Sequence, residues 1–475
     1  MTSVPAANIA AAKAALSHLD MEEKEANIRA SSRDFFWYSP VLKARMDHLV
    51  ADFVVRPKTE AEVIEILKVC YAHDVPVTTR GAGTGNYGQA MPMRGGCVMH
   101  LREMNAVKHC EPGRVVVEPG CLLKDLDAHC IRECGHELRM FSSTWATATV
   151  GGFIAGGSGG VGSVTWGSLR ELGNIIRLRV VTMEAEPRIL EFTGAELARV
   201  SHAYGTNGII TELELPLAPA YDWIDCFVTT KDFDLAMACA DGLANENGIL
   251  LKIASVYEAP TANAYFQRVA PYVEEDDHLI GLMVAPQSFD GFLTFMAQHP
   301  DLKLIYRSDD HDWVRSPGLV FEYGWNHTTL RALKVDPSMT YLQVRYGFPD
   351  HKGLVNQMRT AFPDELIQHL EAIRMDGGNV GFAGLTLVKF TTEDRLDAIV
   401  KAHEDAGALI FNPHRYTLEE GGRQHADARQ LDFKKEADPK GLLNPGKMIT
   451  WDDPDFDYST IYAYPHMAEA PKEDA

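Results

Sequence analysis

Glycine recurs at alternate positions in one short segment, residues 80–88, which reads Arg-Gly-Ala-Gly-Thr-Gly-Asn-Tyr-Gly. Glycine adopts positive φ without strain, and because it has no Cβ it lets backbone N–H groups approach an anion closely. The segment lies between two predicted strands. It therefore differs from a Walker loop, in which Gly-Lys-Ser/Thr opens a helix, and from a Rossmann fingerprint, whose third glycine would stand at Asn86. Taken alone, the pattern fits an anion-binding loop and a tight turn equally well.

A second glycine-rich segment follows about 70 residues later. Residues 149–157 read Thr-Val-Gly-Gly-Phe-Ile-Ala-Gly-Gly. This is more glycine than a helix or a strand needs, and each glycine carries an entropic cost on folding. Two such segments in one unit predict a long ligand that lies along bare backbone, such as a dinucleotide.

Basic and aromatic side chains form a third group of candidates, in the second half of the chain. Aromatic residues interleaved with His and Arg suit a pocket for an oxygenated organic substrate, aromatic or anionic. Against this, Tyr and Trp of mixed sheets are usually core residues, and most histidines are packed and not catalytic. The group comprises Tyr306, Arg307, His311, Trp313, Arg315, Tyr323, Trp325, His327, Arg331, Tyr341 and Arg345, followed by residues 411–416.

The elements that must position these residues form two units. In the first, residues 50–217, a capping box at Thr59 and Glu62 opens a helix, and short strands flank the glycine segments. In the second, residues 218–431, the helical patterns at 232–245, 289–299, 352–362 and 393–406 alternate with strands. The strand patterns at 341–346 and 380–390 are the ones that flank the basic and aromatic group. This order predicts an α+β layer with a largely antiparallel sheet.

Composition excludes several classes of protein. The 475 residues carry a net charge of −21, which argues against a nucleic-acid partner and against an anionic membrane surface. No run approaches the ~20 apolar residues of a membrane span. The first 20 residues have no basic n-region and predict an alanine-rich helix instead of a signal peptide. The eight cysteines are scattered apart from Cys130 and Cys134, which predicts reduced thiols and a cytoplasmic protein.

Five motifs in a fixed order make a resemblance specific. They are Arg-Gly-x-Gly-Thr at residue 80, Val-Glu-Pro-Gly at 117–120, Thr-Val-Gly-Gly at 149–152, Gly-x-x-Gly-Ile-Ile-Thr at 205–211 and Asp-Pro-x-Gly-Leu-Leu-Asn-Pro-Gly-Lys at 438–447. The chain resembles FAD-linked oxidoreductases of the vanillyl-alcohol oxidase and p-cresol methylhydroxylase (PCMH) type. The resemblance implies an α+β fold: a PCMH-type FAD-binding domain of two subdomains with an inserted α+β cap domain. The expected divisions are 1–49 (helical), 50–217 (FAD-binding), 218–431 (cap) and 432–475 (returning to the FAD-binding domain).

The same resemblance implies cofactor contacts along the motifs. The first loop would hold the pyrophosphate, the second the flavin and ribityl chain, and the backbone near residue 209 the adenine side. For Lys447 a solvated surface charge is an equal alternative. No metal site is expected. The implied residues are Arg80, Gly81, Ala82, Gly83, Thr84, Gly85, Asn86, Pro119, Gly120, Ser142, Ser143, Thr149, Gly151, Gly152, Gly208, Ile209, Ile210, Asn444 and Lys447.

Many relatives tether the flavin through a histidine of the first loop. This chain has Asn86 and Tyr87 there, and no His or Cys between residues 74 and 96. The expectation is FAD held without a covalent bond, with a tether from His414 as the alternative.

Three functions remain open from the sequence. The first is hydride transfer from the C–H of an alcohol, such as a 2-hydroxy acid, to flavin N5, although the metal-linked histidine motifs of the D-lactate and glycolate branch are absent. The second is oxidation of a 4-alkylphenol, although Ser168 follows Trp166-Gly167 where that branch has an acid. The third is an electron-transfer subunit of a larger complex, and a nicotinamide-driven reductase is a remote fourth.

Four residues are the predicted catalytic and pocket groups. His414 is the expected base, Arg415 the expected anion ligand, and Tyr87 and His327 the expected pocket groups. The expected partners are a small oxygenated substrate and an acceptor that is oxygen, a quinone or a carrier protein. A homo-oligomer is compatible with the sequence.

Overall fold

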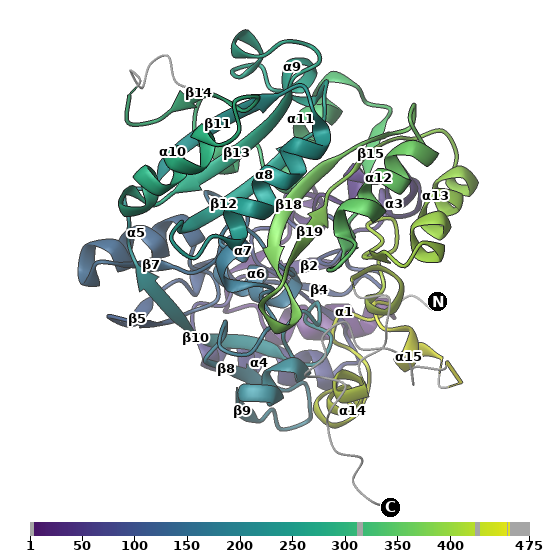
Figure 1. The fold of residues 1–475 in the computed structure, drawn as a ribbon. Coiled ribbons are helices and arrows are strands. Elements are labelled where there is room, and N and C mark those ends of the chain that lie inside the picture. Colours follow the sequence, from purple (N-terminus) through teal and green to yellow (C-terminus); the bar gives the residue numbers. More distant parts are fainter. Residues whose placement is uncertain (1–3, 311–316, 423–427, 454, 457–475) are drawn as a thin grey trace, which may run out of the picture.

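A computed structural model describes residues 4–310, 317–422, 428–453 and 455–456. The predicted pocket residues His311, Trp313 and Arg315, and the chain beyond residue 456, lie outside the described part. The chain forms two lobes, stacked one above the other in Figure 1. Of the described residues, 4–219, 428–453 and 455–456 form the basal lobe, and 224–310 and 317–410 form the cap lobe.

The first sheet of the basal lobe has the order β1 (Met21–Glu22), β2 (Phe53–Val55), β4 (Cys97–His100), β3 (Val77–Arg80), with β2, β4 and β3 parallel. Helix α4 (Glu60–Ala72) makes the crossover, and its N-terminus is capped by Thr59, whose Oγ1 accepts the Glu62 N–H at 3.2 Å. The late segment of the chain joins this sheet, since the Val77 N–H donates to the Leu442 carbonyl at 2.8 Å. Strand β3 therefore leads into the first glycine loop from a sheet that both ends of the chain build.

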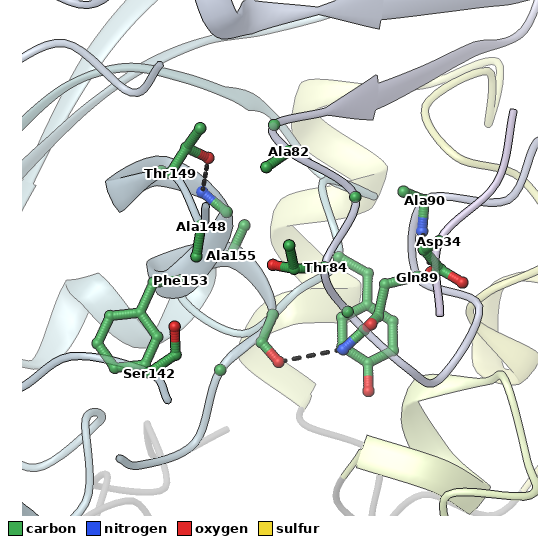
Figure 2. Close-up of a pocket in the computed structure, with 18 of the residues that line it drawn as sticks. Asp34, Ala82, Thr84, Gln89, Ala90, Ser142, Ala148, Thr149, Phe153 and Ala155 are labelled. Carbon is green, nitrogen blue, oxygen red and sulfur yellow. Dashed lines mark hydrogen bonds between the residues drawn. The ribbon is translucent and has the colours of Figure 1, made fainter. Parts of the chain in front are cut away.

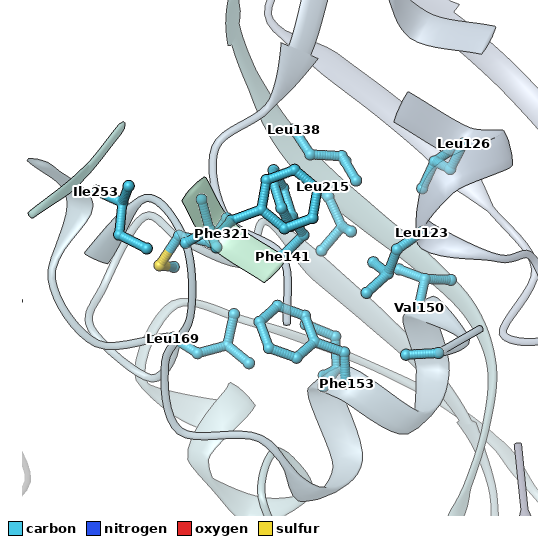
Figure 3. Close-up of a cluster of buried hydrophobic side chains, with 14 of the residues drawn as sticks. Leu123, Leu126, Leu138, Phe141, Val150, Phe153, Leu169, Leu215, Ile253 and Phe321 are labelled. Atoms are coloured by element: carbon cyan, nitrogen blue, oxygen red, sulfur yellow. The ribbon is translucent and has the colours of Figure 1, made fainter. Parts of the chain in front are cut away.

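The second sheet of the basal lobe is antiparallel. Its order is β5 (Val107–Glu111), β6 (Arg114–Val117), β10 (Ile209–Pro219), β8 (Arg177–Val181), β9 (Ile189–Thr193), and β7 (His136–Leu138) also pairs with β10. Helix α5 (Leu123–Cys134) packs on it. Figure 3 shows the core beneath, where Phe141 of this lobe meets Phe321 of the cap lobe edge to face at 5.3 Å between ring centroids. The two lobes thus share one apolar core.

The cap lobe is built on an eight-stranded antiparallel sheet. Its order is β14 (Lys303–Arg307), β11 (Ile224–Thr230), β13 (His278–Val284), β12 (Leu251–Tyr257), β18 (His369–Arg374), β19 (Val380–Gly384), β16 (Val344–Tyr346), β21 (Leu409–Ile410). Helices α8 (Phe233–Asn245), α10 (Phe289–Ala297), α12 (His351–Ala361) and α13 (Glu393–Asp405) match the predicted ones closely. The predicted α+β fold is confirmed.

Two predicted strands are each divided. Residues 341–346 split between β15 (Met339–Tyr341) and β16, and residues 380–390 split between β19 and β20 (Leu387–Lys389). At each break the chain crosses between the eight-stranded sheet and a separate sheet of order β15, β20, β17 (Leu366–Ile367): it enters the eight-stranded sheet between β15 and β16 and leaves it between β19 and β20. The Leu342 N–H donates to the Thr386 carbonyl at 2.9 Å, so the two crossings occur side by side. The strand pattern of a single segment does not reveal such a change of sheet.

The eight cysteines are all free thiols. The sequence offered no partner for Cys134, but the fold brings Cys110 of β5 to it, with 3.6 Å between the Sγ atoms. Within the described residues, no helix is both long enough and apolar enough to cross a membrane.

Candidate cofactor site

A cavity of about 220 Å³ lies where the glycine segments meet, beneath the cap lobe. Its wall includes residues of the first loop and of α6 (Val150–Gly156), with segments near residues 142 and 208. The cap lobe contributes Trp325, Asn326 and Gln343. Figure 2 shows the labelled residues Ala82, Thr84, Thr149 and Ala155 around this space.

The first loop needs glycine for close approach. Gly83 has φ of +68°, and a Cβ there would lie 2.1 Å from Nη1 of Arg80. A Cβ at Gly81 would lie 2.1 Å from Oγ1 of Thr149. Both positions therefore require glycine, which leaves the backbone N–H groups of the loop open to the cavity. An extended ligand with phosphate groups needs such a surface.

Most of the second glycine segment forms a helix, α6, although it holds more glycine than a helix needs. Thr149 caps α6, accepting the Gly152 N–H on Oγ1 at 3.2 Å. A Cβ at Gly151 would lie 2.5 Å from Cβ of Pro119, so glycine allows this helix to pack against the neighbouring loop. Gln89 ties the two segments together, since its Nε2 donates to the Gly156 carbonyl at 3.2 Å (Figure 2).

Asp34, which no sequence motif marks, braces the first loop from the N-terminal segment. Its carboxylate is buried at 3% exposure and accepts the Phe36 and Ala90 N–H groups at 2.9 and 3.1 Å. Burial raises the pKa of Asp34 to about 6, against those hydrogen bonds and the charges of Lys447 and Arg80. Burial also lowers the pKa of Lys447 to about 7, and its Nζ donates to the Gly88 carbonyl at 2.6 Å. Asp34, at the cavity wall, and Lys447, behind it, thus both support the end of the first loop.

The structure brings most of the predicted cofactor residues to the cavity wall. Four do not line it: Arg80, Gly120, Asn444 and Lys447. Three of these support the loop, because the Arg80 guanidinium donates to the Ala82 carbonyl at 3.1 Å and the Asn444 Nδ2 donates to the Gln89 carbonyl at 2.8 Å, while Lys447 holds Gly88. Those that line it are Gly81, Ala82, Gly83, Thr84, Gly85, Asn86, Pro119, Ser142, Ser143, Thr149, Gly151, Gly152, Gly208, Ile209 and Ile210.

Of the four predicted catalytic and pocket residues, Tyr87 lines the cavity, and its hydroxyl donates to the Phe411 carbonyl at 2.8 Å. His414 does not, and its ring is buried with Nε2 2.8 Å from the Tyr341 carbonyl and Nδ1 2.7 Å from Oγ of Ser39. Because Nε2 must donate to that carbonyl, Nδ1 accepts from the serine hydroxyl, and the ring has no lone pair left for a substrate proton. Burial lowers the pKa of His414 to about 4.

Arg415 and His327 also lie away from the cavity wall. The Arg415 guanidinium donates to Glu393 at 2.9 Å and to Asp397 at 3.1 Å. Burial, with the charge of Arg331, lowers the pKa of His327 to about 4. The sequence alone does not show that Glu393 and Asp397 lie beside Arg415, or that Arg331 lies beside His327.

A second cavity of about 80 Å³ adjoins the first on the cap side. The two share Ser158, Gly159, Trp325 and Gln343. Arg345 of β16 and Glu171 are ionisable residues of its wall; Arg374, a third, donates to the Gly378 carbonyl at 2.9 Å. Apolar residues, among them Val344, Ile373, Met375, Leu385 and Phe411, complete the wall.

Glu171 supplies a carboxylate that the sequence appeared to lack. The acid expected after Trp166-Gly167 is replaced by Ser168, but a turn follows in which the Glu171 N–H donates to the Ser168 carbonyl at 3.1 Å. Its Oε1 in turn accepts the Ser168 N–H at 3.2 Å. The Glu171 carboxylate, three residues after Ser168, therefore lies in the wall of the second cavity. In the part of the chain that the structure describes, no group of three His, Cys, Asp or Glu side chains could hold a metal ion.

Comparison with known proteins agrees with this geometry. Residues 51–191 match the family described as FAD binding domain. An uncharacterized FAD-linked oxidoreductase of Mycobacterium tuberculosis is 31% identical over 210 residues, which are 40% of this chain and 44% of that protein. A D-lactate dehydrogenase of Archaeoglobus fulgidus is 33% identical over 178 residues, 35% of this chain and 38% of that protein. The chain spans less than half the length of these relatives.

Solved structures share the fold over nearly the whole chain. Alkyldihydroxyacetonephosphate synthase aligns with a TM-score of 0.69 at 14% identity, over 90% of this chain and 83% of the other. p-Cresol methylhydroxylase aligns with a TM-score of 0.67 at 15% identity, over 93% and 96%. The protein thus has the fold of FAD-binding proteins of the PCMH type. Its residues 51–191 are a FAD binding domain, so the predicted cofactor, FAD, is confirmed.

Proposed function

We propose that the protein is a FAD-dependent oxidoreductase that takes hydride from the C–H of an alcohol, a 2-hydroxy acid, to flavin N5. The observation that carries the proposal is the second cavity, which is small, adjoins the cofactor cavity and has a guanidinium in its wall. Relatives named as D-lactate dehydrogenase and glycolate oxidase subunit support the same donor class. When bound, FAD supplies the hydride acceptor.

The second cavity offers the groups that orient such a substrate. Arg345 would bind the carboxylate, for which a guanidinium offers paired donors. The apolar wall around Phe411 would exclude water. Gln343, whose Nε2 lies 3.4 Å from Oδ1 of Asn326, stands where the cavities join and would hold the hydroxyl-bearing carbon toward the cofactor.

Glu171 is the group that we assign to the substrate proton. A base must accept the hydroxyl proton as hydride leaves the carbon. The geometry of His414 opposes the role first expected of it, whereas Glu171 lies in the wall of the second cavity. Tyr87 would complete the wall of the cofactor cavity, with its hydroxyl turned to Phe411.

A substrate screen tests the proposal. The purified yellow protein is mixed without oxygen with straight-chain 2-hydroxy acids, with 4-ethylphenol and with NADPH, and flavin absorbance is followed. Bleaching by a hydroxy acid is expected. Bleaching by the phenol alone or by NADPH alone would contradict the proposal, and the absence of bleaching by any of them would favour an electron-transfer subunit. Repeating the assay in air and with a dye acceptor separates an oxidase from a dehydrogenase.

Replacing Arg345 by methionine should lower kcat/KM for the hydroxy acid by an amount equivalent to ~2–4 kcal/mol, the usual loss for a desolvated charge-assisted contact. Steady-state kinetics with FAD content matched to the wild type measures it. Arg415→Met is the comparison, because Arg415 lines neither cavity and pairs with Glu393 and Asp397. A loss confined to Arg415→Met would return the anion site to Arg415.

FAD should leave the protein on denaturation, because the first loop has no His or Cys to form a covalent link. Acid precipitation is expected to give a yellow supernatant and a colourless pellet, read by absorbance. A yellow pellet would instead show a covalent link. His202 lines the cavity and would then be the first candidate, ahead of His414.

A further inference from the structure

We propose that Trp325 is the wall between the two cavities and sets the length of substrate that the second one accepts, and that the buried Glu371 holds it there as a positioning residue. The substrate part of this inference rests on the proposed function. The placement of Trp325 by Glu371 does not.

The backbone at Trp325 is held in an unusual conformation. Its φ of 50° and ψ of −140° lie outside the regions that side-chain-bearing residues normally occupy, and such a conformation persists only where the surroundings impose it. The Trp325 N–H donates to Oε1 of Glu371 at 2.6 Å. A Cβ on the preceding Gly324 would lie 2.8 Å from the same oxygen, so glycine permits the close approach. The carboxylate therefore fixes the turn.

Glu371 is itself rigidly placed. It lies on β18, paired with Ser255 of β12, and is 1% exposed. Its Oε2 accepts the Ser255 hydroxyl at 2.6 Å, and its Oε1 lies 2.9 Å from Nε2 of His369. Three donors meet this one buried carboxylate, two on Oε1 and one on Oε2. A carboxamide accepts at only one of its two ends, so it weakens this set of hydrogen bonds.

The indole lies where the cofactor and substrate cavities meet. Trp325 lines both, and Cη2 of its ring would lie 3.2 Å from a Cβ placed on Gly159 of the glycine-rich segment. Its Nε1 is buried, and among the residues that the structure describes it has no acceptor. An N–H without a partner at this boundary is available to a polar group of a bound ligand. Removing the indole would join the two cavities.

The first test reads the position of Trp325 without activity. An indole in contact with a flavin quenches flavin fluorescence by electron transfer, so FAD-loaded Trp325→Phe should fluoresce more brightly than the wild type. Glu371→Gln should shift the fluorescence in the same direction. Glu258→Gln is the matched control, because Glu258 is also a buried carboxylate of the cap lobe that accepts a backbone N–H, that of Gln368 at 2.8 Å, without touching Trp325.

The second test reads substrate length. For Trp325→Ala, the ratio of kcat/KM for a six-carbon 2-hydroxy acid to that for glycolate should rise by about tenfold or more, the scale of one methylene in an apolar pocket. Trp325→Phe should rise less. An unchanged ratio in Trp325→Ala would overturn the role in specificity.

The outcomes separate the two proposals. If the wild type oxidises no 2-hydroxy acid, the proposed function fails, and flavin fluorescence still decides the placement of Trp325. Unchanged fluorescence in Trp325→Phe overturns that placement whether or not Glu371→Gln folds. A Glu371→Gln protein that keeps FAD and the wild-type fluorescence overturns the positioning role of Glu371.

Discussion

Gly83→Val protein is expected to be purified without FAD and to keep the helix and strand content of the wild type. At φ of +68° a β-branched residue is strained, and its Cβ would lie 2.1 Å from Nη1 of Arg80, whose guanidinium also holds the Ala82 carbonyl. The loop would have to move, and it lines the cavity from Gly81 to Tyr87. The ratio of flavin to protein absorbance after desalting measures the loss, and far-UV circular dichroism measures the fold.

Gly113→Val is the matched control for that loss. Gly113 also has positive φ, +95°, but an added Cβ there meets nothing within 4 Å, and the residue lies in the hairpin between β5 and β6. It therefore reproduces the backbone strain without touching the cavity. A Gly83→Val protein that is as yellow as Gly113→Val would remove the first loop from the cofactor site.

Glu171→Gln should slow flavin reduction by the hydroxy acid ~10²–10⁴-fold, the range for removal of a general base. Glutamine keeps the shape of the side chain and can still accept the Ser168 N–H on its amide oxygen, so the turn that presents residue 171 should survive. Stopped-flow absorbance under anaerobic conditions measures the rate. Because only the proton acceptor is lost, the affinity for the acid should change much less than the rate.

Glu196→Gln provides the same chemical change at an exposed site of the basal lobe, where Glu196 pairs with Arg199. Its reduction rate should equal that of the wild type. If Glu171→Gln reduces its flavin within threefold of Glu196→Gln, Glu171 is not the base, and another group of the cavity wall must accept the proton.

The sequence predicts the cofactor side of the site better than the side of the second cavity. The cofactor loops could be predicted because their signal is local: glycine at 81, 83 and 151 is needed where neighbouring backbone or side chains leave no room for a Cβ. The helices of the cap lobe could be predicted for the same reason, since their apolar periodicity lies within each segment. The helical form of 150–156 was missed because its cap, Thr149, was masked by the number of glycines.

The substrate side could not be predicted in this way. His414 and Arg415 looked suited to chemistry by residue type, but Tyr341, Ser39, Glu393 and Asp397 already engage their polar atoms. Glu171 carried no motif, because its place in the wall depends on a turn. Residue type states what a side chain could do, whereas its neighbours in space determine whether it is free to do it.

The amino-acid sequence by itself determined the cofactor class and the α+β plan, because bare backbone for a dinucleotide and the periodicities of helices and strands are properties of contiguous residues. Only the tertiary structure decided which groups line the second cavity and which groups hold them there. Separate elements of the two lobes contribute these groups, which are Arg345, Glu171, Trp325 and Glu371. The packing of the cap lobe on the glycine-rich segment brings them together. Contacts of that kind depend on packing across hundreds of residues, which no local pattern encodes.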